Sequence, residues 1–377
     1  MEPDILLNAY LDLNLLLIAG TVIWCGLRWV LRRSELATAY LPQLRLLNGL
    51  TVLLAMTPLM IVAFTTWIVA HPPNLSDMLV SQYLQGNVSL TATQLETLLG
   101  LRESMVRDLL TQRALWAQAV YWIGIAGFLL CLLHLVVSVA RLRRSLSGTF
   151  LWKKLGRVEL RVSDTARVAF STRGIRTLYV VLPQELLSNP RDLNLTISHE
   201  LQHFRQRDIE CEFLLEMLRP LLFWNPAFYV WRREIRILRE YACDQALTSR
   251  RNFDVRGYCE CLIRACHAAA QERVFFTRRS PAVALVDRRE TRHRSTLNRR
   301  ILAATATPPA AEQKIGWTMV SGLLVGSVLI TAMLIQRPSD WSQDRLMLST
   351  IVNLERLATR NSQPVSAFQS GFVTASQ

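Results

Sequence analysis

The sequence has little of what would mark a soluble enzyme or a secreted domain. Only 19% of its 377 residues are charged, and it contains no internal repeat, glycine-rich phosphate loop or low-complexity tract. Its seven cysteines are an odd number and two lie inside apolar runs, so no secreted disulfide framework is indicated. Cys259, Cys261, Cys266 and His267 lack a second pair at zinc-finger spacing, and we interpret them as reduced cysteines and a histidine on a packed helix.

What the sequence has in excess is apolar residues and arginine. Hydrophobic residues make up 51% of the chain, the mean hydropathy is +0.20 and the pI is near 10.1, which together predict membrane spans flanked by basic segments. Residues 140–315 hold 32 basic and 18 acidic side chains and so carry the whole net charge of +14. Because these charges are scattered and form no stripe, we expect the cytoplasmic part of a membrane protein and no direct nucleic-acid binding.

Four apolar runs are long enough to cross a bilayer. The first is too long for a signal peptide and lacks a cleavage site. Arginines follow the first and third runs, and this asymmetry predicts that those flanks are inside. The predicted order is an outer N-terminus (1–12), spans at 13–31, 46–70, 117–140 and 315–335, a cytoplasmic loop (32–45), an outer loop (71–116), a cytoplasmic domain (141–273), a basic membrane-proximal linker (274–314) and an outer tail (336–377).

The cytoplasmic domain is predicted to mix strands and helices. Short β-branched or alternating segments predict strands at 158–164, 167–172 and 177–183, and an edge of this small sheet could hold an extended peptide by strand addition. A helix is predicted from 197 to Pro220, and a second one follows the Asn225-Pro226 turn. In the outer loop, residues 90–110 predict two short amphipathic helices.

The stretch His199-Glu200-Leu201-Gln202-His203 is where residue types and spacing together predict a chemistry. On a helix, positions four apart lie on one face, so both imidazoles can reach a single Zn²⁺. The glutamate between them would then stand beside the reacting water and act as the general base. The alternative is a solvated helix carboxylate between two histidines, which is the commoner environment of a glutamate.

A catalytic zinc needs a third protein ligand, and Glu240 is the predicted one. No histidine follows His203 before His267, whereas an antiparallel helix return would bring Glu240 back over the histidine pair. Asp244, one turn further, is predicted to accept the free N–H of a ligand imidazole. Asp208 could cap or brace the motif helix. The oxyanion-stabilising group stays open, with Tyr241, Arg256, Tyr258 and His267 as candidates.

Three ordered motifs carry a family resemblance: His199 to Asp208, then Phe223-Trp224-Asn225-Pro226, then Arg239 to Asp244. Their order inside a cytoplasmic segment between a third and a fourth span resembles the BlaR/MecR-type membrane zinc metallopeptidases over about residues 5–335. That family includes sensor-transducers that respond to β-lactams, cleave themselves and trigger removal of a repressor. The resemblance implies a gluzincin-like domain with His199, His203 and Glu240 as zinc ligands and Glu200 as the catalytic residue.

One departure from the drug-sensing members of that family concerns the tail. Those members continue after the last span into a penicillin-binding domain whose serine is acylated with help from the lysine of an S-x-x-K motif. Here 42 residues follow, the three lysines are Lys153, Lys154 and Lys314, and neither S-x-x-K nor K-T-G occurs. We therefore expect no direct covalent β-lactam sensing by this chain.

Taken together, the sequence predicts an α-helical polytopic membrane protein with four transmembrane helices and a cytoplasmic α+β zincin domain of the gluzincin type. The predicted function is a zinc endopeptidase with one catalytic Zn²⁺, in a bacterial inner membrane, with both termini outside. Its expected partners are the lipid bilayer and a cytoplasmic substrate, either a repressor-like protein or the chain itself, and a homodimer is left open. The alternative is a signalling or scaffold protein that keeps the zincin shape without proteolysis.

Overall fold

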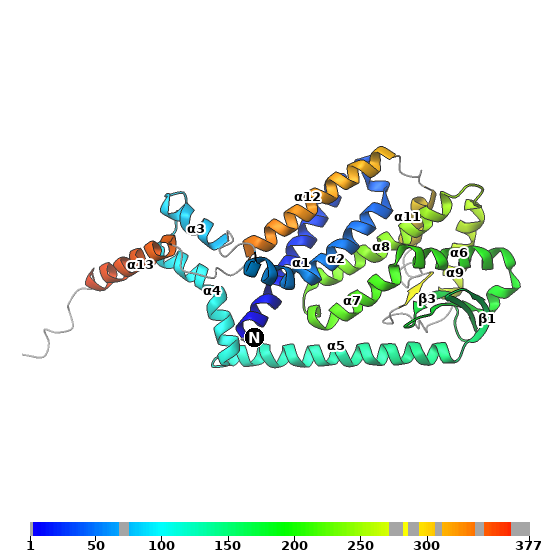
Figure 1. Ribbon diagram of the computed structural model, residues 1–377, viewed down its shortest axis with the longest axis horizontal. Helices are drawn as coiled ribbons and strands as arrows, with labels where there is room; N and C mark the ends of the chain where they lie inside the picture. The colour runs from blue at the N-terminus through cyan, green and yellow to red at the C-terminus, as the bar shows by residue number, and fades with distance from the viewer. Residues whose placement is uncertain are drawn as a thin grey trace, which may run out of the picture. The chain divides into compact units, whose positions relative to one another are not determined.

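The protein is described here by a computed structural model that covers residues 3–67, 75–270, 282–285, 294–305, 311–335 and 343–362. Its elements are drawn in Figure 1. The chain forms two compact units. The first consists of Met1–Leu15, Thr57–Tyr121 and Leu329–Gln377, and the second of Leu16–Met56 and Trp122–Val328.

Three helices of the described residues are long and apolar enough to cross a membrane. The apolar stretches are Leu6–Leu31 within α1 (Pro3–Leu31), Leu115–Ser147, which is the whole of α5, and Ile315–Ile335 within α12 (Ala311–Ile335). Only 6% of the most apolar α5 window is buried, so its side chains are available to lipid. The predicted span at 46–70 falls on α2 (Tyr40–Trp67), with residues 68–70 outside the described ones, and a fourth span stays a prediction.

The first unit has a small apolar core built by three amphipathic helices, α3 (Leu75–Leu84), α4 (Ala92–Thr111) and α13 (Gln343–Ser362). The buried residues of this core are Val80, Ala92, Leu95, Leu348 and Val352. α4 begins with a capping box between Thr91 and Gln94 and runs on unbroken, so residues 92–111 form one helix where two short ones were predicted.

The second unit contains a five-stranded sheet of order β1-β2-β4-β3-β5. The three predicted strands are present as β2 (Val158–Ser163), β3 (Phe170–Arg173) and β4 (Leu178–Pro183). The sequence did not predict the two outer strands, β1 (Phe150–Leu155) and β5 (Val283–Ala284). β2 and β4 pair in parallel and the other neighbours pair antiparallel.

Helices cover this sheet and build the main core. They are η2 (Gln184–Ser188), α6 (Pro190–Gln206), α7 (Asp208–Leu222), α8 (Pro226–Thr248), α9 (Val255–Ala270) and α11 (Arg294–Thr305). α6 contacts β3 and β4 on one side and α8 and α9 on the other, so the motif helix lies in the middle of the packed unit.

The predicted long helix from 197 to Pro220 is two helices. The chain turns at Arg207, whose φ of 59° lies in the left-handed region, and its N–H bonds back to the carbonyls of His203 and Phe204. α7 then starts at Asp208 and continues through Pro220 to Leu222. Periodicity could not predict the break because apolar residues continue on both sides of it.

Part of the predicted linker at 274–314 belongs to the second unit. β5 pairs with β3, and α11 packs on α8 and α9 with Ala303 and Ala304 buried. The structure thus differs from the prediction for these described residues. An arginine-rich sequence suggested solvent, but one face of α11 is apolar and one of its arginines is paired inside the unit.

α8 is held along one side by the N-terminal helices. The indole N–H of Trp231 donates to Thr51 Oγ1 at 2.9 Å, and Gln245 Nε2 donates to the Thr38 carbonyl at 3.0 Å. The rings of Tyr40 and Tyr241 meet edge to face with centroids 5.1 Å apart. α8, the second helix after the motif helix, is therefore fixed against α2 and the turn before it.

Candidate metal centre

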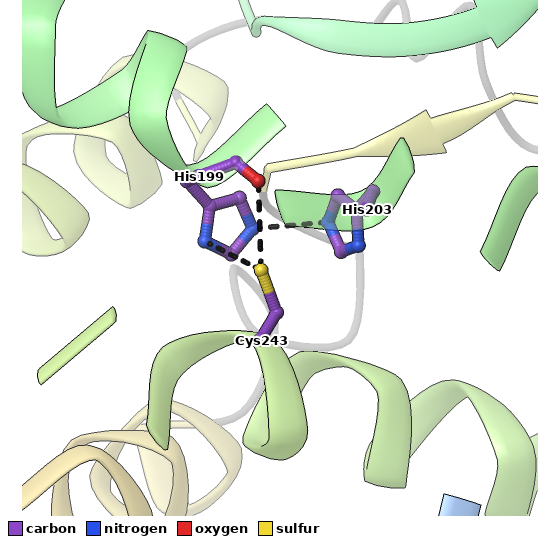
Figure 2. Close-up of side chains that lie close together, drawn as sticks. All are labelled: His199, His203 and Cys243. Atoms are coloured by element: carbon purple, nitrogen blue, oxygen red, sulfur yellow. Dashed lines mark hydrogen bonds between the residues drawn. The ribbon is translucent and has the colours of Figure 1, made fainter. Parts of the chain in front are cut away.

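The two motif histidines meet inside the protein on α6. Asn189 caps this helix by accepting from the Asp192 N–H at 3.3 Å, and Pro190 is its first residue, so the helix begins well before the motif. His199 and His203 are both fully buried. Their Nε2 atoms lie 3.1 Å apart, and Figure 2 shows the two rings pointing toward one another.

The outer nitrogen of each ring is occupied by an acceptor. His203 Nδ1 lies 2.7 Å from Asp208 Oδ2. His199 Nδ1 lies 2.8 Å from the Tyr258 hydroxyl, which itself donates to Asp244, and 3.3 Å from Asp244 Oδ1. This network assigns the proton of each neutral imidazole to Nδ1. Both Nε2 atoms then direct their lone pairs toward the same point, and Arg300 Nη2 lies 3.4 Å from the Nε2 of His199.

Two lone pairs that face one another repel unless a cation lies between them. The distance between the two Nε2 atoms fits a metal ion as that cation. Two nitrogen ligands of a tetrahedral zinc, each at about 2.0–2.1 Å, are about 3.3 Å apart. The observed separation of 3.1 Å is close to that value. The carboxylate partners of the Nδ1 atoms are the usual outer neighbours of metal-binding histidines, because they fix the tautomer and orient the ring.

Two side chains of α8 are candidates for a third ligand. Glu240 Oε2 lies 3.6 Å from His199 Nε2 and its Oε1 lies 3.9 Å from His203 Nε2, so this carboxylate faces both inner nitrogens. Cys243 Sγ lies 3.5 Å from His199 Nδ1, and one potential ligand atom from each of His199, His203 and Cys243 falls within a common 4.8 Å (Figure 2). The buried His-His-Cys group could bind a metal, and Glu240 stands beside it.

Protonation separates the two candidates. Burial raises the pKa of the Cys243 thiol to about 12, and its Sγ lies 3.5 Å from both Nδ1 and the carbonyl oxygen of His199, on the side of the ring away from Nε2. Burial also tends to raise the pKa of Glu240, but the Arg300 guanidinium and the two imidazoles outweigh it and hold this pKa below its ordinary value. The charged carboxylate is thus the better donor toward a cation at the Nε2 atoms.

Glu200 is buried between the two histidines on α6. Neither of its carboxylate oxygens has a hydrogen-bond partner of regular geometry among the described residues. Burial raises its pKa, and the imidazoles of His203 and His199 together with Ser171 lower it only in part. Burying a carboxyl without regular hydrogen bonds costs stability, so its presence here indicates a functional role.

Arg300, which the sequence placed in a linker, reaches the same centre from α11 and is fully buried. Its Nε lies 2.7 Å from Asp244 Oδ2 and its Nη2 lies 2.9 Å from Glu240 Oε2. Sequence reasoning missed this residue because it is one arginine among many in its segment, with no spacing to the motif that could single it out.

The four open candidates for the oxyanion group do not gather at the Nε2 side. Tyr258 binds at the Nδ1 side of His199, and Tyr241 packs against Tyr40. Arg256 and His267 are exposed, and Arg256 pairs with Glu260 at 3.1 Å. Tyr258 instead belongs to the group that orients His199.

A buried His-Glu-x-x-His helix with a carboxylate from a following helix, in a chain with membrane-spanning helices, defines a membrane metallopeptidase type of centre. The chain belongs to the BlaR1 peptidase M56 family, because the model of that family matches residues 9–294. The resemblance to BlaR/MecR-type proteins is thereby confirmed. No curated protein matches the chain. Family membership points to a metal-dependent membrane protease with a role in signalling.

Proposed function

We propose that this protein is a zinc endopeptidase of the HExxH gluzincin type that hydrolyses a peptide bond on the cytoplasmic side of the membrane. The observation that carries the proposal is the meeting of the two Nε2 atoms, 3.1 Å apart, with the Glu240 carboxylate beside them. Family membership supports the reaction class.

In this proposal, different residues bind the metal, transfer the proton and orient the histidines. His199 Nε2, His203 Nε2 and one oxygen of Glu240 would hold the zinc, whose chemistry is to polarise water and the substrate carbonyl. Glu200 takes a proton from the attacking water and passes it to the leaving amine nitrogen. Asp208 holds the His203 ring, and Asp244 with Tyr258 holds the His199 ring.

The cytoplasmic orientation and the substrate class are part of the proposal. The whole positive excess lies in residues 140–315, as the positive-inside bias expects of a cytoplasmic segment. An extended peptide could reach the centre by pairing with β3, which carries Ser171 near Glu200. The edge strand on that side of the sheet is the short β5, which pairs with β3, so a substrate protein would have to displace β5. We propose a repressor-like protein or the chain itself as the substrate.

The test uses the full chain in detergent or nanodiscs, with zinc content and cleavage of a quenched-fluorescence peptide library as readouts. His203→Ala is expected to lose zinc and activity. Glu200→Gln is expected to keep one zinc per chain and lose at least 100-fold in kcat/KM, because general base catalysis contributes about 10²–10⁴-fold.

Glu185→Gln is the control, since Glu185 is an exposed carboxylate that pairs with Arg167, and neither residue belongs to β3 or to the metal centre. It is expected to leave zinc content and kcat/KM unchanged. Wild-type protein that binds no zinc, or Glu200→Gln that cleaves as fast as wild type, would reject the peptidase function.

A further inference from the structure

Arg300 is a fully buried guanidinium in the described part of the second unit. A charge is buried in this way only where it is paired and hydrogen-bonded, because removing an unpaired charge from water is strongly unfavourable. Its neighbour Arg299 on α11 points outward and is exposed. The two adjacent arginines therefore differ in environment, and only Arg300 reaches the metal centre.

Four contacts fix the guanidinium. Toward Asp244 it makes a two-point contact, with Nε at 2.7 Å from Oδ2 and Nη2 at 3.1 Å from Oδ1. Nη2 also lies 2.9 Å from Glu240 Oε2, and Nη1 donates to the Leu285 carbonyl at 2.6 Å. One side chain from α11 thus connects both carboxylates of α8 with the residue that follows β5.

These contacts continue to the histidines. Asp244 accepts from Tyr258 and lies 3.3 Å from His199 Nδ1, so a guanidinium that fixes Asp244 also fixes the His199 ring. On the other side, the pairing with Glu240 Oε2 leaves Oε1 as the oxygen nearer to His203 Nε2. Arg300 is thereby in contact with Glu240 itself and with Asp244, which lies beside the ring of His199.

We propose that Arg300 is a positioning residue of the metal centre, which fixes Asp244 against His199 and turns Glu240 toward the metal, and that α11 is therefore a structural part of the centre. This inference rests on the proposed function. It joins the centre to a membrane helix, because α12 begins at Ala311, a few residues after α11 ends at Thr305.

Two other roles for Arg300 make different predictions. If the guanidinium only supplied positive charge, a lysine would replace it, since lysine carries the same charge but has no two-point fork. If the guanidinium competed with the metal, its removal would tighten zinc binding, because Nη2 lies only 3.4 Å from His199 Nε2. A positioning role instead requires that both Arg300→Lys and Arg300→Gln bind zinc more weakly.

The experiment measures zinc affinity by competition with a chromogenic chelator, on the full chain in detergent, for wild type, Arg300→Lys, Arg300→Gln and the control Arg299→Gln. We expect about 10-fold weaker zinc binding for Arg300→Lys and about 10–100-fold weaker binding for Arg300→Gln, the range found when outer partners of metal ligands are removed. Arg299→Gln should match wild type.

Melting of the zinc-free proteins separates loss of the site from loss of the fold. If Arg300→Gln fails to fold, Arg300→Lys decides alone, because it keeps the buried charge. Wild-type affinity in Arg300→Lys, or tighter zinc binding in either variant, would overturn the inference. These outcomes leave the peptidase proposal intact, whereas wild type without zinc would remove the peptidase proposal itself.

A double variant adds a readout that a general structural role would not affect. If Arg300 acts through Asp244, the effects of Arg300→Gln and Asp244→Asn on zinc affinity should not be additive. The double variant should then bind zinc no more than about 3-fold more weakly than the single variant with the lower zinc affinity. Independent, multiplying losses would show that Arg300 does not work through Asp244 and would overturn this part of the inference.

Discussion

Asp208 Oδ2 lies 2.7 Å from His203 Nδ1, although the two residues are on different helices. His203 is in the last turn of α6 and Asp208 is the first residue of α7. The contact exists because the chain turns sharply at Arg207 and brings the start of α7 back under the motif. Both residues are fully buried, so the hydrogen bond is shielded from water.

The first prediction follows from this contact. Asp208→Asn keeps the size of the side chain but removes the charge that holds the His203 ring and raises its basicity. Zinc affinity is expected to fall about 10-fold, the lower end of the effect of losing such a partner. Chelator competition measures it, with Glu210→Gln as the control on the same helix. An unchanged affinity would show that the Arg207 turn alone orients His203.

The second prediction concerns the turn itself. Arg207 has φ 59° and ψ 32°, a left-handed conformation that costs a residue with a Cβ about 1–2 kcal/mol. Arg207→Gly removes that cost and is expected to raise the unfolding midpoint. Arg207→Val, with a branched Cβ, is expected to lower the midpoint and to weaken zinc binding because Asp208 shifts. Thermal melting with and without zinc checks both, and a destabilising glycine would refute the strain argument.

The two sides of the centre differ in how far the sequence could predict them. The i, i+4 spacing of His199 and His203 is a local feature, and both histidines lie on α6 where helical periodicity places them. The start of α8 after the Asn225-Pro226 turn is also visible in the local sequence. Asp208 depends on a helix break that no composition change announces. Arg300 and β5 depend on long-range pairing of a segment whose arginine content suggested solvent. A high arginine content therefore fails to predict exposure where a buried carboxylate pairs with one of the arginines, as Asp244 does with Arg300.

The third prediction uses a buried ion cluster between α7 and α8. Burial tends to raise the pKa of Glu212, but Arg239, Arg232 and Arg236 outweigh it and hold this pKa well below its ordinary value. A depressed pKa contributes stability that is present above the ordinary carboxyl pKa and is lost as the pH falls toward the folded value. The protein should therefore lose stability progressively below about pH 4.5.

Glu212→Gln tests this cluster. The variant leaves the buried Arg239 without its charged partner at 2.8 Å and is expected to lose about 3–5 kcal/mol of stability at pH 7. Its stability should also depend less on pH in the acid range, since one group with a shifted pKa is gone. Glu185→Gln, which removes an exposed partner of Arg167, is the control and should change stability by less than about 1 kcal/mol.

The last prediction concerns the contact between a membrane-spanning helix and the catalytic unit. Gly127 of α5 lies under the ring of Phe223, which follows α7, and a Cβ at this position would come within 2.3 Å of the ring. Gly127→Ala must therefore push Phe223 away and is expected to lower the unfolding midpoint, with a cost of about 1–3 kcal/mol for overpacking. Gly124→Ala, one turn earlier with open space around it, supplies the same change in helix propensity without the clash. Combining Gly127→Ala with Phe223→Ala should recover part of the loss, because the ring that clashes is gone. Equal midpoints for Gly127→Ala and Gly124→Ala in detergent and in nanodiscs would show that α5 does not press on this face of the unit.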